Sequence, residues 1–299
     1  MIFIFKKGVV GIFFAFFTVS AVWAQGMSFR VEDSKIRLSV APGSSQAGTI
    51  RLYSQSDTEI HLRVYLEDWK YEEKQDGSKN FFPAQSTPLS GAGWIKFNPG
   101  EITLPAYGVG SINYIVNVPQ EATGGYYAVM FFETLLSTPV QSEGIGIDSD
   151  EVRSGIDLAL RIGSLFYIEV KDTIKRVAGL KNLSVSKDEE DKPLFIAVDL
   201  QNSGNVDITA DGTFHIMDKK GMVYARGEFN KIYTFPGDTA RLTSSWGEPL
   251  SKGRYDLILT IDLGKALEEA EMGRGPVITQ EAEIEIDIDG QVIRVGELR

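Results

Sequence analysis

The chain has 299 residues, of which 43% are hydrophobic, and its formal net charge is −11. This length suits two domains of ordinary size, and the hydrophobic fraction excludes a disordered chain. An acidic protein is repelled by a phosphate backbone, so we expect no nucleic-acid partner. The chain has no cysteine, which excludes disulfides, thiol catalysis and thiolate metal ligands.

The N-terminus predicts a secretory signal peptide at residues 1–24. Lys6 and Lys7 precede an apolar run over residues 8–20, and Val22-Trp23-Ala24 follows as the cleavage signal. The run of about 13 residues is shorter than the roughly 20 that a membrane-spanning helix needs. We therefore expect cleavage after Ala24 and no membrane span in the mature chain, with an uncleaved N-terminal anchor as the alternative.

Apolar and polar residues alternate through the first half of the mature chain, which predicts strands of a two-sheet sandwich. Turn residues such as Pro42-Gly43, Asp76-Gly77 and Gly124-Gly125 separate the runs, and their spacing favours an all-β fold over α/β. The predicted inward residues are Ile36, Leu38, Val40, Ile50, Leu52, Ile60, Leu62, Val64, Leu66, Ile112, Tyr114, Val116 and Val118.

A long polar segment separates these strands from an unusually long one. Residues 136–154 include an acidic stretch at 148–151, and a loop of this length is usually functional or disordered. Alternation then continues to Val170 over about 15 residues, against a mean strand of 5–6. We predict that this strand overhangs its domain or continues into the interdomain linker. The apolar residues of its first half are Ile156, Leu158, Leu160 and Ile162.

A second set of alternating runs begins after Lys171-Asp172. Its predicted inward residues are Leu194, Ile196, Val198, Leu200, Phe214, Ile216, Tyr255, Leu257, Leu259, Ile261, Leu263, Ala282, Ile284, Ile286 and Ile288. The last of these strands carries four carboxylates on its other face, and carboxylates two apart on a strand do not surround one point. We therefore expect a solvated face there and no metal site. The sequence predicts an all-β chain of two tandem immunoglobulin-like β-sandwich domains, at residues 25–172 and 173–299.

The order of motifs in the first domain resembles PapD-like periplasmic chaperones, which assemble pili and fimbriae. The motifs are Val64-Tyr65-Leu66-Glu67-Asp68-Trp69, Trp94-Ile95-Lys96-Phe97-Asn98-Pro99, Gly125-Tyr126-Tyr127-Ala128-Val129-Met130-Phe131 and Leu165-Phe166-Tyr167. In that family the last strand of the first domain lends apolar residues to an incomplete pilus subunit, a form of β-augmentation. The resemblance implies that Ile156, Leu158, Leu160 and Ile162 bind a partner strand. The alternative is that these four side chains fill the core of their own domain.

The resemblance is incomplete at the site that holds the subunit's C-terminal carboxylate. The family uses an Arg of the first strand and a Lys of the last strand for this contact. Arg37 matches the first position and implies a carboxylate contact, but Ser164 stands at the second. The first domain is also similar to the peptidoglycan-directed domain of WxL-interacting surface proteins.

No motif indicates catalysis. His61 and His215, the only histidines, are predicted on polar strand faces in different domains, which is a poor arrangement for a zinc site. The chain has no nucleophile elbow, phosphate-binding loop or dinucleotide fingerprint. We therefore expect no enzyme activity and no cofactor.

Three functions stay open. The first is a chaperone or assembly factor of the periplasm or cell envelope, whose partner is an exported polypeptide or pilus-like subunit. The second is a surface module that binds peptidoglycan or a neighbouring envelope protein. The third, least favoured, is a carbohydrate-active enzyme in which exposed Trp69, Tyr71, Phe81 and Phe82 stack on sugars. The favoured interpretation of these four aromatic residues is that they cover a sheet edge or core margin.

Overall fold

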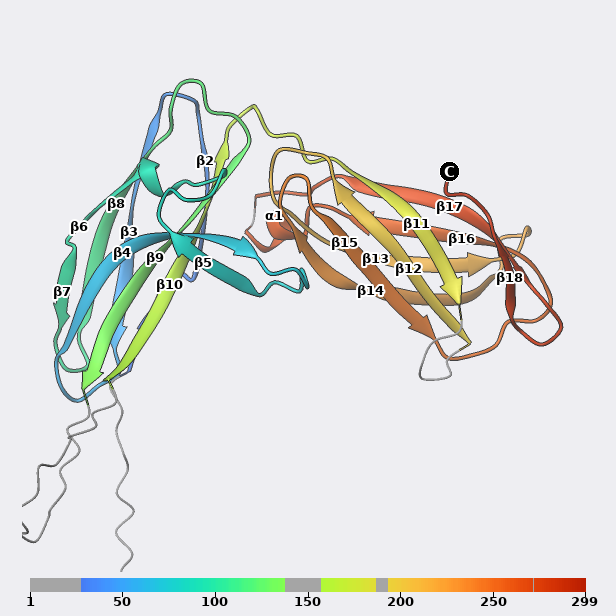
Figure 1. Ribbon diagram of the computed structural model, residues 1–299, viewed down its shortest axis with the longest axis horizontal. Coiled ribbons are helices and arrows are strands. Elements are labelled where there is room, and N and C mark those ends of the chain that lie inside the picture. Colours follow the sequence, from blue (N-terminus) through green and yellow to red (C-terminus); the bar gives the residue numbers. More distant parts are fainter. Residues whose placement is uncertain (1–27, 138–156, 187–192, 271) are drawn as a thin grey trace, which may run out of the picture.

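The computed structural model describes residues 28–137, 157–186, 193–270 and 272–299, and these residues form two β-sandwiches (Figure 1). The predicted all-β fold of two tandem immunoglobulin-like sandwiches is confirmed. The predicted signal peptide and most of the predicted polar loop lie outside the described residues. The proposed domain boundary at residue 172 falls in the turn that follows the last strand of the first sandwich.

The first sandwich has two sheets, with strand orders β1-β3-β8-β6 and β2-β10-β9-β4-β5, and β7 also pairs with β4. Strand β2 runs parallel to β10. The elements are β1 (Phe29–Val31), β2 (Lys35–Val40), β3 (Ser45–Ser54), β4 (Ile60–Tyr71), β5 (Lys79–Pro83), η1 (Ala92–Trp94), β6 (Ile95–Asn98), β7 (Glu101–Leu104), β8 (Val109–Asn117), β9 (Gly125–Ser137) and β10 (Asp157–Val170).

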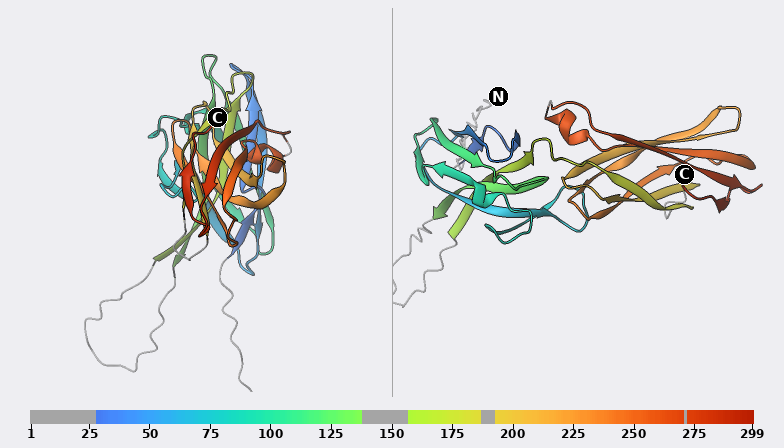
Figure 2. Two further views of the ribbon diagram at one scale, coloured as in Figure 1. Left: turned by 90° about the vertical axis from the view of Figure 1, so that its right-hand side faces the viewer. Right: turned by 90° about the horizontal axis from the view of Figure 1, so that it is seen from above.

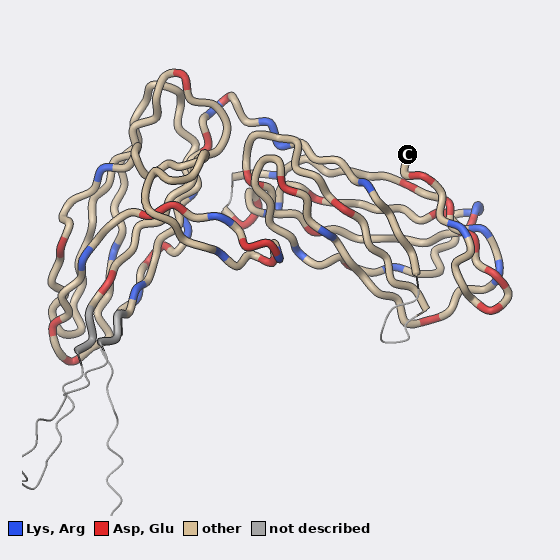
Figure 3. The backbone as a smooth tube through the Cα atoms, viewed as in Figure 1, with Lys and Arg blue, Asp and Glu red and all other residues tan. Residues whose placement is uncertain are grey.

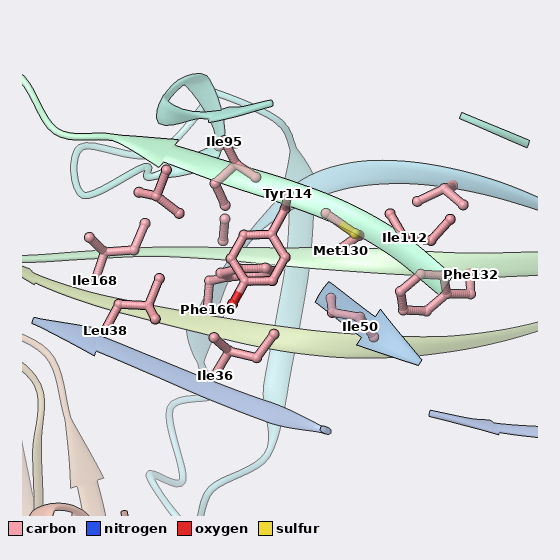
Figure 4. Packing of buried hydrophobic residues seen from close by; sticks show 14 of the residues in the cluster. Ile36, Leu38, Ile50, Ile95, Ile112, Tyr114, Met130, Phe132, Phe166 and Ile168 are labelled. Atoms are coloured by element: carbon pink, nitrogen blue, oxygen red, sulfur yellow. The ribbon is translucent and has the colours of Figure 1, made fainter. Parts of the chain in front are cut away.

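The core of the first sandwich lies between these sheets. The predicted inward residues are buried there, apart from the partly buried Leu66. Figure 4 shows Tyr114 of one sheet beside Phe166 of the other, with ring centroids 5.0 Å apart. Burial of a large apolar side chain contributes about 1.5–3 kcal/mol, so this layer stabilises the sandwich without disulfides.

The second sandwich has a three-stranded sheet, β11-β12-β15, and a five-stranded sheet, β14-β13-β16-β17-β18. Figure 2 shows it as an elongated body that meets the first sandwich at one end. The elements are β11 (Ala178–Ser186), β12 (Leu194–Asn202), β13 (Ile208–Met217), β14 (Val223–Thr234), β15 (Thr239–Trp246), β16 (Gly253–Asp262), α1 (Lys265–Glu269), β17 (Val277–Ile286) and β18 (Val292–Val295).

One predicted core residue of the second sandwich is not in its core. Ala282, Ile284 and Ile286 are buried as the alternation predicts, but Ile288 is 82% exposed. Strand β17 ends at Ile286, and the backbone then turns at residues 287–291. The prediction for Ile288 is therefore wrong, because the alternation continues in the sequence beyond the end of the strand.

Candidate functional site

The long strand β10 has one edge that is only half covered. Strand β9 pairs with β10 from Asp157 to Glu169, whereas β2 pairs with its other edge only from Leu165 to Val170. Along residues 157–164 no described strand pairs with that second edge. Strand β10 thus extends beyond β2 but stays paired with β9 (Figure 1).

The burial of the core-facing side chains changes along β10. Phe166 and Ile168 are fully buried where β2 flanks the strand, whereas Leu160 and Ile162 are only partly buried and pack at the margin of the first core. The backbone of Leu158 belongs to the same free edge. Ile156 lies outside the described residues.

Arg37, the predicted carboxylate contact, is held by carboxylates of the chain itself. Its side chain is 8% exposed, and its guanidinium donates to Glu169 Oε1 at 2.7 Å and to Asp207 Oδ1 and Oδ2 at 3.1 and 2.8 Å. Burial alone would lower the pKa of Arg37, but the charges and hydrogen bonds of the two carboxylates outweigh burial and raise it. A contact between Arg37 and a ligand carboxylate therefore stays a prediction. The ligand would have to share the Arg37 guanidinium with Glu169 and Asp207.

The same cluster joins the two sandwiches. Glu169 lies on β10, Asp207 precedes β13 of the second sandwich, and Arg176 from the connecting segment donates to Glu169 at 2.9 Å. Two arginines thus face two carboxylates at a site where all four side chains are nearly inaccessible. Tyr127 adds a further link, because its hydroxyl donates to Asp207 Oδ1 and accepts from the Asp207 backbone N–H. Burial and the nearby Asp207 charge raise the pKa of Tyr127.

An aromatic contact lies beside this cluster. Phe235 of the second sandwich packs against Trp69, Tyr71 and Tyr127 of the first, with ring centroids 5.2, 4.9 and 4.3 Å apart. Trp69 is 1% exposed and its indole N–H donates to the Ala128 carbonyl. The second sandwich covers this end of the sheet, so Trp69 is not free to stack on a sugar; its burial agrees with the favoured interpretation, in which the aromatic residues cover a sheet edge or core margin.

The hairpin formed by β4 and β5 also reaches the second sandwich, as Figure 1 shows. The Tyr233 backbone N–H on β14 donates to the Gln75 carbonyl in the hairpin turn at 2.9 Å. The Tyr233 ring lies 5.5 Å from that of Tyr71. The ion cluster, the aromatic contact and this hairpin together hold the sandwiches in one relative position.

A cleft of about 360 Å³ lies between the two sandwiches beside Arg37. Its lining includes Lys35, Tyr167 and Tyr233, with Glu269 of α1 on the second sandwich, whose carboxylate is 4.0 Å from Lys35 Nζ. Lys35 is paired with Leu165 in the β2–β10 ladder, next to Ser164. Ser164 itself is buried, and its hydroxyl donates to the Asp33 carbonyl. Lys35 is thus the exposed cation of the cleft. In the sequence, Lys35 was recognisable only as a polar residue of an alternating strand.

The remaining candidate residues do not assemble into a site. His61 is exposed on β4 and His215 half-exposed on β13, in separate sandwiches. The carboxylates of Glu281, Glu283 and Glu285 pair with Arg299, Lys219 and Arg254. In the described part of the chain, no group of three or more His, Asp or Glu side chains is arranged to hold a metal ion. Nor does any helix there have the length and apolar character to cross a membrane.

Comparisons with known proteins find similarity only among solved structures: no family model and no curated protein matches the chain. The chain is similar to the class 5 fimbriae chaperone CfaA, with 13% identity and a TM-score of 0.47, covering 84% of this chain and 98% of that one. It is also similar to the CupB2 chaperone of Pseudomonas aeruginosa, with 12% identity and a TM-score of 0.37, covering 81% and 95%.

A third similarity is to a chain of the CsuC–CsuE chaperone–tip adhesion subunit pre-assembly complex of Acinetobacter baumannii. The identity is 10% and the TM-score 0.39, covering 84% of this chain and 97% of that one. Each of the three similarities is to a chaperone or chaperone complex, with an identity of 10–13% and a TM-score below 0.5.

Proposed function

We propose that this chain is an exported, non-enzymatic binding protein that acts as a periplasmic chaperone or assembly factor and engages a partner polypeptide by β-augmentation at the free edge of β10. The partner is an exported polypeptide, such as a pilus-like subunit. The place of action is the periplasm or cell envelope, which the predicted signal peptide supports.

The observation that carries this proposal is the edge along residues 157–164. At about 3.3 Å per residue it offers roughly 25 Å of strand backbone. The N–H and C=O groups that point away from β9 are able to form a ladder with one further strand. An added strand would satisfy these groups as β2 does at the other end of β10.

The side chains support the same interpretation. Leu160 and Ile162 share the inward face of β10 with Phe166 and Ile168, but they lose the cover that β2 provides further along the strand. A partner strand with apolar inward residues would complete this cover and remove more apolar surface from water. We include Ile156 and Leu158 in the proposed binding row, as the resemblance implies.

The cleft extends the proposal to the end of the partner chain. Lys35 and Arg37 lie at its wall, on the strand that pairs with the C-terminal half of β10. A terminal carboxylate of a partner that follows the free edge would reach these cations. We propose Lys35 as the accessible charge in this contact and Arg37 as a shared one.

The proposal is tested by replacing both Leu158 and Leu160 with Asp in the full chain and purifying its mature form, residues 25–299. The proposed partner strand would then meet two carboxylates in an apolar contact, which is strongly unfavourable. Native mass spectrometry of the protein purified gently from its host envelope should show a one-to-one polypeptide complex for the natural chain and none for the double variant. A matched control is Val109→Asp, because Val109 is exposed on the other sheet of the same sandwich.

Circular dichroism melting separates loss of binding from loss of folding, since Leu160 packs partly on the core. A folded double variant that keeps its polypeptide would contradict the proposal. If the natural chain carries no polypeptide but sediments with cell-wall material, the peptidoglycan-binding alternative replaces it.

A further inference from the structure

The short helix α1 presents a carboxylate to the cleft between the two sandwiches. Ala266, Glu269 and Ala270 line the cleft, and residues three and four apart share one face of a helix. Another side of α1 is anchored by Leu267, which is buried. Glu269 is therefore the polar side chain on the cleft face of α1, and the short alanine side chains leave it accessible from the cleft.

Two glycines fix the base of the segment that carries α1. A Cβ atom on either Gly264 or Gly275 would collide with the backbone of the other glycine. The Leu263 N–H also donates to the Pro276 carbonyl at 2.9 Å. Because this close contact holds the backbone of α1 in place, a change at the cleft would involve the Glu269 side chain and not the helix as a whole.

The Glu269 carboxylate is shared between one lysine of each sandwich. Its Oε1 is 2.8 Å from Lys231 Nζ of the second sandwich, and its Oε2 is 4.0 Å from Lys35 Nζ of the first. The hydrogen bond from Lys231 lowers the pKa of Glu269, and the charge of Lys35 adds to this effect, so the carboxylate is ionised at neutral pH. The shorter contact thus lies within the second sandwich, and the longer one crosses the cleft.

The contact between Lys35 and Glu269 is weak enough to be exchanged. The two side chains are 55% and 45% exposed, and exposed ion pairs contribute little because solvent screens them. Among the residues that the structure describes, no other carboxylate lies within 4.0 Å of Lys35 Nζ. Burial and the nearby charge of Lys35 lower the pKa of Lys79. Lys35 is thus a cation beside a second cation, where a ligand carboxylate would be favourable.

The charged residues that line the cleft balance one another. Asp33 and Glu269 are acidic, whereas Lys35 and Arg37 are basic, and the Arg37 guanidinium is already paired with two buried carboxylates. Figure 3 shows acidic and basic residues on both sides of the junction between the sandwiches. While Glu269 faces Lys35, the cleft therefore has no excess of positive charge with which to attract an anion.

We propose that Glu269 is an internal competitor for the carboxylate that the cleft binds, and that it sets the affinity of the cleft for the terminus of a partner chain. This inference rests on the proposed function, in which Lys35 receives a terminal carboxylate. The ligand carboxylate takes Lys35 from Glu269, and Glu269 keeps its shorter contact with Lys231. A neutral group does not replace the charge of Glu269 at Lys35, so the competitor also selects for a carboxylate.

The test is an NMR titration of residues 25–299 with N-acetylalanine, and with N-acetylalanine amide as the neutral probe, followed at the backbone N–H signal of Lys35. The variant Glu269→Gln should bind N-acetylalanine about threefold more tightly than the natural chain, as the removal of an exposed ion pair allows, and should gain no affinity for the amide. The matched control is Glu268→Gln, which removes the same charge from the neighbouring residue of α1. Glu268 pairs with Lys265 and does not line the cleft, so this variant should bind as the natural chain does.

The variant Lys35→Met should abolish binding of N-acetylalanine, which assigns the probe to the cleft. Equal affinities of the Glu269→Gln and Glu268→Gln variants would overturn the inference but leave the carboxylate contact of the proposed function in place. An equal gain for the neutral amide would also overturn it, because the effect would then not depend on the charge of the ligand. If N-acetylalanine binds neither the natural chain nor Glu269→Gln, the inference and the carboxylate contact both fail, and the double variant of Leu158 and Leu160 still tests the strand-binding edge.

Discussion

Replacement of Asp207 by Ala should destabilise the protein at the contact between the two sandwiches. Asp207 accepts from both terminal nitrogens of the Arg37 guanidinium and from the Tyr127 hydroxyl, and its side chain is fully inaccessible. Its removal leaves two buried arginines with the single carboxylate of Glu169. The cluster thereby changes from neutral to positive in a place from which water is excluded.

The cost follows from the buried charge that loses its partner. Truncation of one member of a buried ion pair typically costs 3–5 kcal/mol, and the remaining bond from Arg37 to Glu169 moderates this to about 3 kcal/mol. For domains of this size, 1 kcal/mol corresponds to roughly 2–4 °C in Tm. We therefore expect the melting temperature to fall by about 6–12 °C in calorimetry.

A double variant tests whether charge is the cause. Arg37→Met with Asp207→Leu removes both members of the pair and leaves Glu169 paired with Arg176. Replacing a buried pair by apolar residues is often neutral or stabilising, so this variant should recover most of the lost stability. The reasoning is refuted if Asp207→Ala lowers Tm by less than about 2 °C, or if the double variant is no more stable than that single one.

Three further variants test other contacts. Phe235→Ala should cost about 3 kcal/mol, because it empties an aromatic contact, and should increase the radius of gyration in small-angle scattering. Asp68→Ala should cost about 3 kcal/mol, since its buried carboxylate accepts four hydrogen bonds from residues 86–90, and should accelerate proteolysis of that loop. Glu269→Gln should lower Tm at pH 7 but make progressively less difference as the pH falls below the ordinary value of 4.5. The reason is that the hydrogen bond from Lys231 lowers the pKa of Glu269, so its contribution is lost on protonation.

The strands and cores were predictable because alternation is a local property of the sequence. Ile112, Tyr114 and Val116 occupy one face of β8 whatever that strand pairs with, and a strand has only two faces. The same argument gave the unusual length of the strand that ends at Val170. It failed for Ile288 because alternation alone does not mark where a strand ends.

The contact between the sandwiches was beyond prediction from the sequence. Asp207 is 170 residues from Arg37 in the chain, and its sequence neighbours give no sign of a buried ion pair. Trp69 looked exposed because its burial depends on Phe235, which is contributed by the other sandwich. The sequence did not predict Lys35 as a candidate site residue, because it identified Lys35 only as a polar residue of an alternating strand. The cleft that Lys35 lines exists only once both sandwiches meet.

The free edge of β10 is longer than any edge strand of the first sandwich, although β3 also has a single described partner strand along residues 45–51. Unpaired strand edges favour aggregation, and proteins commonly keep them short. The edge strands β1, β6, β5 and β2 have 3, 4, 5 and 6 residues, whereas β10 and its neighbour β9 have 14 and 13. The uncovered part of β10, residues 157–164, thus exceeds every edge strand of this sandwich in length. It also combines open backbone with the incompletely buried Leu160 and Ile162. Under the proposed function, a partner strand would supply the cover that no described strand gives to this edge.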